Sequence, residues 1–126
     1  MKNDNHVWDN KHPTAQMLGR WQPWHAGHRW LIDQRLNEGK NVLICVREVS
    51  KDDKNPYNSI EVKENVENAL KELIDTNRVK VIIIPDIESV NYGRGVGYEI
   101  IEHEPPKDIG AISATKIREK ILMEKL

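Results

Sequence analysis

Short apolar runs recur along the chain, separated by longer segments that mix polar and apolar residues. The runs cover residues 15–20, 41–47 and 79–85, and the last two are rich in branched aliphatic side chains. Runs of this kind are typical of strands buried within a sheet. A further strand is predicted at 98–102, after a loop that contains three glycines: Gly93, Gly95 and Gly97.

Helices are predicted between these strands. The first is expected at 27–38, with Gly39 placed to end it. The second follows the polar loop 50–58, where Ser59 could be the N-cap of an apolar stripe formed by Val62, Val66, Ala69, Leu70 and Leu73. A last helix is expected to start near Ser113. This alternation predicts an α/β fold, a doubly wound, Rossmann-like parallel sheet covered by helices on both sides.

Length and composition indicate one globular domain. The chain has 126 residues, of which 38% are hydrophobic and 31% charged, which suits a single modest core. We assign residues 15–126 to this domain. Residues 1–14 are interpreted as a flexible arm or an oligomer contact, which leaves a homo-oligomer open. No run is long enough to span a bilayer and the first residues lack an apolar signal stretch, so we expect a cytoplasmic protein without a membrane partner.

Charge and cysteine content narrow the function. Nineteen Lys and Arg residues against twenty Asp and Glu residues give a formal net charge of -1. Proteins that bind duplex nucleic acid usually carry a basic surplus, so we expect no nucleic-acid partner, and any anion site must be a local concentration of charge. The single cysteine, Cys45, lies within a predicted strand and is interpreted as a buried residue rather than a nucleophile.

The turn after the first predicted strand carries the first chemical motif. It reads Gly19-Arg20-Trp21-Gln22-Pro23-Trp24-His25-Ala26-Gly27-His28. Two histidines three residues apart at a helix start can face one ligand, and the helix adds free N–H groups and a partial positive charge. Gly27 would let a phosphate approach the backbone, and Arg20 adds a permanent charge. A metal site lacks a well-placed third ligand, and the neighbouring Gly, Pro and Arg residues favour an anion site over ordinary surface histidines.

A second motif lies at the start of the last predicted helix, at residues 112–118. Ser113 is expected to be the N-cap, and Thr115 places a hydroxyl in the first turn. Lys116 and Arg118 lie near the same end, where the helix dipole disfavours cations, which indicates a bound anion. For this segment alone, an ordinary capped helix with solvated cations is the alternative.

The two motifs resemble the signatures of the HxGH-type nucleotidylyltransferase superfamily. Gly19–His28 resembles its opening motif, and Ile112–Arg118 resembles its second signature, I-S-x-T-x-x-R. The form G-R-x-Q-P-x-H-x-G-H is closer to the nicotinamide mononucleotide adenylyltransferases than to the cytidylyltransferases. The segments Asn55–Tyr57 and Ile84–Ile87 also look like the archaeal-type members of that adenylyltransferase group. The resemblance implies transfer of AMP from ATP to a phosphorylated acceptor such as nicotinamide mononucleotide, with release of pyrophosphate.

The resemblance also implies roles for individual residues. His25, His28 and Arg118 would be catalytic. The nucleotide-binding residues would be Gly19, Arg20, Trp21, Gly27, Ser113 and Thr115. The acceptor phosphate would attack the α-phosphorus in line, and Mg²⁺ would bridge triphosphate oxygens rather than be held by protein side chains alone.

The stretch between Asp86 and Ile112 departs from the adenylyltransferases, because it is shorter than the region that helps form their acceptor and base pockets. Acceptor identity is therefore not carried over, and Arg47, Tyr92 and Arg94 are the candidates for acceptor binding. Two other functions stay open. One is cytidylyl transfer from CTP to an alcohol phosphate, which the compact length favours. The other is a nucleotide-binding module that has lost catalysis.

Overall fold

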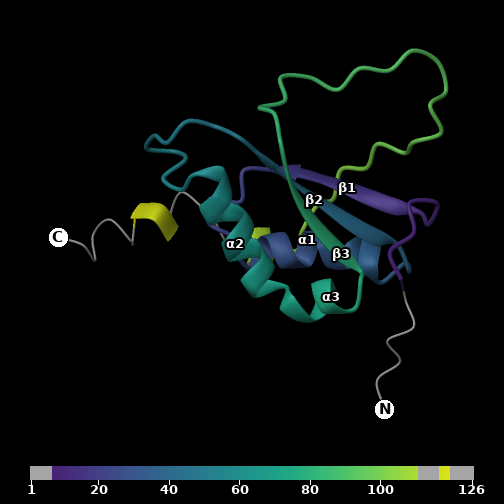
Figure 1. Cartoon of the computed structure of the whole chain (residues 1–126), viewed down its shortest axis with the longest axis horizontal. Coiled ribbons are helices and arrows are strands. Elements are labelled where there is room, and N and C mark those ends of the chain that lie inside the picture. The colour runs from purple at the N-terminus through teal and green to yellow at the C-terminus, as the bar shows by residue number, and fades with distance from the viewer. Residues whose placement is uncertain (1–6, 111–116, 120–126) are drawn as a thin grey trace.

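The computed structural model describes residues 7–110 and 117–119 (Figure 1). Its elements, in chain order, are β1 (Thr14–Gly19), α1 (Ala26–Leu36), β2 (Asn41–Arg47), α2 (Ser59–Ala69), α3 (Lys71–Asp75), β3 (Val79–Ile84) and α4 (Lys107–Gly110). The three strands predicted at 15–20, 41–47 and 79–85 are thus confirmed to within one residue at each end. The α/β class is confirmed with them.

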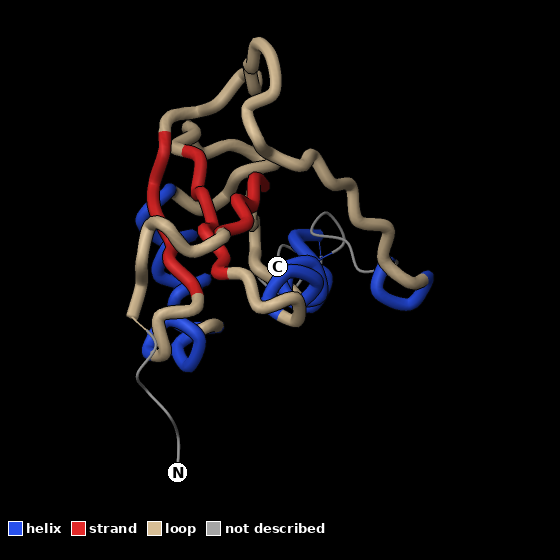
Figure 2. The backbone as a smooth tube through the Cα atoms, turned by 90° about the vertical axis from the view of Figure 1, so that its right-hand side faces the viewer, coloured by secondary structure: helices blue, strands red, loops and turns tan. Residues whose placement is uncertain are grey.

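The sheet is parallel and has the order β1-β2-β3. Thr14 lies opposite Asn41, and Val42 lies opposite Val79. Because both crossovers run in the same direction across the sheet, right-handed connections place their helices on the same face. Figures 1 and 2 show this arrangement, with α1, α2 and α3 on one side of the strands and the segment after β3 passing over the other.

The core lies between the sheet and these helices. Alternate residues of the strands face it and are buried: Met17, Val42, Ile44, Val46, Val79 and Val81. The helices contribute Ile32, Val62, Val66 and Leu70 to the same cluster. Of the apolar stripe predicted for the second helix, Val62, Val66 and Leu70 are confirmed as core residues and Leu73 packs against them. Ala69 is exposed, because α2 ends at this residue and a separate short helix, α3, follows.

The opposite face of the sheet carries no helix among the described residues. Leu18 and Ile82 on this face are 42% and 37% exposed. The Lys80 ammonium lies 4.8 Å from the centre of the Trp8 ring, so the chain before β1 contacts this face as well. Parallel sheets are usually covered on both faces, and the described residues supply one helical layer. Within them, no helix is both long and apolar enough to cross a membrane.

The start of α2 corrects one prediction. Its N-cap is Asn58, not Ser59: the Asn58 side chain accepts a hydrogen bond from the Glu61 N–H at 2.8 Å, and the Glu61 carboxylate accepts one from the Asn58 N–H at 3.1 Å. This is a capping box. Ser59 is already inside the helix and buried, and its hydroxyl donates to Glu48 at 3.4 Å.

The C-terminal end of α1 agrees with the prediction that Gly39 ends this helix. The helix α1 ends at Leu36, and Gly39 follows with a φ of 77°, a left-handed conformation that glycine adopts without strain. The Gly39 N–H donates to the carbonyl of Leu36 at 3.0 Å. Gly39 therefore ends the helix, as predicted.

The strand predicted at 98–102 is wrong. These residues have no regular structure, and Tyr98 and Ile100 are 83% and 76% exposed. A strand needs a neighbour to satisfy its N–H and C=O groups, and none of the three described strands pairs with this segment. The start of the last predicted helix, at 111–116, lies outside the described residues, whereas residues 117–119 are helical.

Candidate functional site

The first motif forms the turn between the carboxyl end of β1 and the start of α1. Trp21 is its anchor, because the residue is only 2% exposed and its indole N–H donates to the Cys45 carbonyl on β2 at 3.0 Å. A Cβ at Gly19 would lie 3.0 Å from the Trp21 ring, a tight contact, so a side chain there would crowd the buried ring. Gly19 and Trp21 therefore shape the turn, and the buried Trp21 ring is a core residue.

The two histidines of the motif cap the helix. His25 is the N-cap of α1, and its Nδ1 accepts a hydrogen bond from the Gly27 N–H at 3.0 Å. The Nδ1 of His28 accepts one from the His25 N–H at 3.2 Å. This is a capping box in which imidazoles replace the usual hydroxyl and carboxylate. The rings stack with their centroids 3.7 Å apart and an interplanar angle of 18°.

This hydrogen-bond pattern assigns the tautomer of both rings. Each Nδ1 is an acceptor for a backbone N–H, so the proton of the neutral imidazole resides on Nε2. Each histidine therefore has an Nε2–H group with which to donate to a ligand. The capping box therefore fixes which nitrogen of each ring can donate to a ligand.

The surroundings keep both rings uncharged near pH 7. Burial lowers the pKa of His25. Burial, and to a smaller extent the charge of His25, lowers the pKa of His28 from 6.5 to about 4. His28 is packed against the indoles of Trp21 and Trp24, with ring centroids at 4.8 Å and 5.3 Å. The pair thus supplies directed neutral donors, and permanent charge at the site must come from elsewhere.

Gly27 is required by the histidines themselves. A Cβ at this position would lie 2.8 Å from Cε1 and 3.0 Å from Nδ1 of the His25 ring, closer than real contacts allow. The sequence predicts that Gly27 lets a phosphate approach the backbone closely. The structure adds that the glycine makes room for the His25 ring in its capping position.

Arg118 reaches this turn from the far end of the chain. Its Nη1 donates to the Gln22 carbonyl at 2.7 Å, across 96 residues of sequence. The predicted juxtaposition of the two motifs is therefore seen for Arg118. Ser113 and Thr115, assigned to nucleotide binding, lie outside the described residues.

Arg20 is exposed at the start of the turn, and its charge acts on Asp52 in the loop after β2. In that loop the pKa of the Asp52 carboxyl is lowered, chiefly by the Asn55 backbone N–H and, as a smaller contribution, by the charge of Arg20. Arg20 and Arg118 therefore add two guanidinium groups to the turn that holds the histidines. The N-terminus of α1 adds a partial positive charge at the same edge of the sheet.

Gln22 is a site residue that the sequence analysis did not single out. It is 2% exposed, and its carboxamide donates to the Tyr57 carbonyl at 2.9 Å and accepts from the Tyr57 N–H at 3.0 Å. The available signal was its position between Trp21 and Trp24, because a polar residue among large apolar ones is often buried. A buried amide needs hydrogen-bond partners. Its partners, which lie far along the chain, were not readable from the sequence.

The three candidates for acceptor binding, Arg47, Tyr92 and Arg94, lie apart from the histidine turn. Arg47 donates from Nε to Asp86 at 3.2 Å and forms an ion pair with it through Nη2 at 3.1 Å, so its guanidinium anchors the chain after β3. Tyr92 and Arg94 are exposed in the segment beyond, whose outer turn lies away from the start of α1 (Figure 1). The described contacts do not join these three residues to the histidine turn, and their part in acceptor binding stays a prediction.

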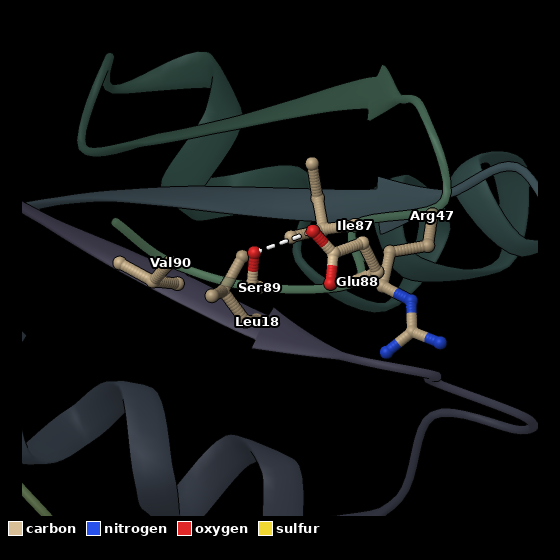
Figure 3. Close-up of a pocket in the computed structure, with 6 residues that line it drawn as sticks. All are labelled: Leu18, Arg47, Ile87, Glu88, Ser89 and Val90. Carbon is tan, nitrogen blue, oxygen red and sulfur yellow. Dashed lines mark hydrogen bonds between the residues drawn. The ribbon is translucent and has the colours of Figure 1, made fainter.

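A shallow hollow of about 200 Å³ lies beside Arg47, on the face of the sheet that carries no helix. Its lining consists of Leu18, Arg47, Ile87, Glu88, Ser89 and Val90. Figure 3 shows the segment after β3 running alongside β1 here, with the Ser89 hydroxyl directed to Glu88, which accepts its hydrogen bond at 2.6 Å. The hollow is small and open, and the histidines do not contribute to it.

Across the described ranges, no three His, Cys, Asp or Glu side chains form a group that could hold a metal ion. Comparison of the chain with protein-family models and with curated proteins found no match.

Proposed function

We propose that this chain is a nucleotidylyltransferase that transfers AMP from ATP to a phosphorylated small-molecule acceptor, of which nicotinamide mononucleotide is the leading candidate. One observation carries the proposal. Two stacked, neutral imidazoles at the N-terminus of α1 have both Nδ1 atoms bound by backbone N–H groups, which leaves two Nε2–H donors for one anion. Arg118 joins the same turn from the end of the chain.

The chemistry needs no nucleophilic side chain. An oxygen of the acceptor phosphate attacks the α-phosphorus, the bond from that phosphorus to the bridging oxygen of the β-phosphate breaks, and pyrophosphate leaves with the electron pair. Negative charge increases on the oxygens around the α-phosphorus and on the leaving group. Preorganised N–H donors and guanidinium groups stabilise that charge without reorganisation. His25 and His28 would donate to the transferred phosphoryl group, and Arg118 and Arg20 would hold the remaining phosphates.

Magnesium belongs to this proposal as part of the substrate. The described residues offer imidazole and guanidinium donors at the turn rather than a carboxylate cluster. That donor set suits a triphosphate whose magnesium is held by its own oxygens and by water. The ion, when bound with the triphosphate, would neutralise part of its charge.

The finer fold assignment is also a proposal. We infer that β1-β2-β3 is one half of a doubly wound sheet in which β1 lies where the strand order reverses. The position of the histidine turn supports this inference, because doubly wound sheets bind ligands outside the carboxyl ends of the strands at that point. His25 and His28 lie at the start of α1, after the short turn 20–24 that follows the carboxyl end of β1.

Pyrophosphate release tests the proposed activity. ATP, CTP, GTP and UTP are each combined with nicotinamide mononucleotide and with a set of alcohol phosphates, in the presence of magnesium. We expect release with ATP and nicotinamide mononucleotide, and a decrease of about two orders of magnitude or more in His28→Ala, the range for one lost transition-state donor. His12→Ala is the matched control, because the His12 ring contacts the Gly39 carbonyl at the amino end of the strands.

The outcomes separate the alternatives. Preference for CTP with an alcohol phosphate would replace adenylyl by cytidylyl transfer. Nucleotide binding without pyrophosphate release from any pair would indicate a module without catalysis. Near-normal turnover in His28→Ala would remove His28 from the mechanism.

A further inference from the structure

Gln22 links three parts of the chain at the histidine turn. Its side chain pairs with the backbone of Tyr57 through two hydrogen bonds, at 2.9 Å and 3.0 Å. Tyr57 directly precedes Asn58, the N-cap of α2, so the loop after β2 is tied to the loop after β1. Both functional groups of the carboxamide are used, as a buried amide requires.

The backbone carbonyl of the same residue accepts the hydrogen bond from Arg118. A guanidinium is planar and its N–H groups point in fixed directions, so an acceptor at 2.7 Å from Nη1 constrains where the remaining donors point. The position of the Gln22 carbonyl depends in turn on the Gln22 side chain, which is 2% exposed and held at Tyr57. Hydrogen bonds therefore connect the Tyr57 backbone to the Gln22 side chain, and the Gln22 carbonyl to the Arg118 guanidinium.

We propose that Gln22 is a positioning residue that directs the Arg118 guanidinium toward the polyphosphate. It acts through its own backbone carbonyl and does not touch the substrate. The proposal rests on the proposed function, in which Arg118 binds phosphate. It predicts that removing the Gln22 side chain weakens polyphosphate binding only while Arg118 is present.

A double-mutant cycle tests this dependence. The dissociation constants of inorganic tripolyphosphate and of ATP with magnesium are measured by calorimetry for the wild type, Gln22→Met, Arg118→Ala and the double variant. Gln22→Met should weaken binding about tenfold, or about 1.4 kcal/mol, beside an intact Arg118. In the Arg118→Ala background the same change should cost less than about twofold.

Asn58→Ala is the matched control. It removes the N-cap of α2 one residue beyond Tyr57, and therefore disturbs the same region without removing the Gln22 contacts. Its effect on binding should be the same with and without Arg118. If Gln22→Met does not fold, Gln22→Asn takes its place, because that carboxamide is one methylene too short to reach both Tyr57 atoms.

Every outcome bears on the proposal. Equal weakening by the Gln22 variant in both Arg118 backgrounds would overturn it, because Gln22 would then be a structural anchor only. A wild type that binds tripolyphosphate but releases no pyrophosphate with any substrate pair would overturn the transferase proposal, and the cycle would still decide the role of Gln22. A wild type that does not bind tripolyphosphate would overturn both.

Discussion

The stacked histidines predict that the free energy of unfolding falls as the pH is lowered from 6.5 toward 4. Burial first, and the charge of His25 second, lower the pKa of His28 to about 4 in the folded chain. The unfolded chain takes up this proton near the ordinary value of 6.5. Between the two values the unfolded state binds more protons, so stability increases with pH. The contribution is fully present above pH 6.5 and is lost as the pH falls through the folded-state pKa.

The structure sets the size of the effect. At about 1.4 kcal/mol per pH unit, the gap between 6.5 and about 4 corresponds to about 3 kcal/mol. The His28 ring is only half-buried, and screening by solvent reduces this figure to about 2 kcal/mol. The lowered pKa of His25 acts in the same direction. Backbone hydrogen bonds lower the pKa of Asp52 and Glu61, whose contributions are lost only below their ordinary values of 3.8 and 4.5.

Urea denaturation of the wild type and of His28→Asn, between about pH 7.5 and about pH 4.5, measures the effect. The asparagine oxygen can take the place of Nδ1 as acceptor for the His25 N–H, but it does not titrate. The wild type should lose about 2 kcal/mol more than the variant over this range. Parallel pH profiles, or an NMR titration of the His28 ring with a midpoint near 6.5, would refute the reasoning, because the rings would then be solvated and chargeable.

Two further substitutions test the turn, each by urea denaturation and pyrophosphate release. Gly27→Ala should displace the His25 ring and lower turnover by about tenfold or more, because a misplacement of about 1 Å at a site lowers the rate at least this much. Gly93→Ala is its control, since a Cβ there meets open space. Trp21→Phe should cost about 1–3 kcal/mol of stability, because it removes the donor to the buried Cys45 carbonyl. Trp24→Phe is the corresponding control, and equal losses in the two tryptophan variants would contradict the assignment.

The strands and helices around the core could be predicted because their signals are local. Val62, Val66 and Leu70 recur at helical spacing, and all three are buried. The strand predicted at 98–102 failed for the opposite reason. A run of apolar residues indicates a strand only if a neighbouring strand pairs with it, and pairing is a long-range property that composition does not contain. The N-cap was missed by one residue, because Asn58 and Ser59 are both good capping residues.

The spacing of residues in the histidine turn could be read from the sequence, but the protonation state of its imidazoles could not. The spacing of His25, Gly27 and His28 indicated an anion site at a helix start. Their protonation depends on burial and on which ring nitrogen the backbone occupies, and neither is visible in the spacing. The role of Gln22 depends on partners 35 and 96 residues away. Contacts of that range become visible only once the chain is folded.

In the function proposed here, the neutrality of the histidine pair determines how the site would bind a polyphosphate. If the imidazoles were cations, the two rings at 3.7 Å would repel each other, and each Nδ1–H would face a backbone N–H. As neutral rings they stack and cap α1 without that conflict. In that proposal, the charge that attracts the phosphates would come from the helix end and from the guanidinium groups of Arg20 and Arg118. Direction and charge are thus supplied by different residues, and the position of Arg118 matters as much as the presence of the histidines.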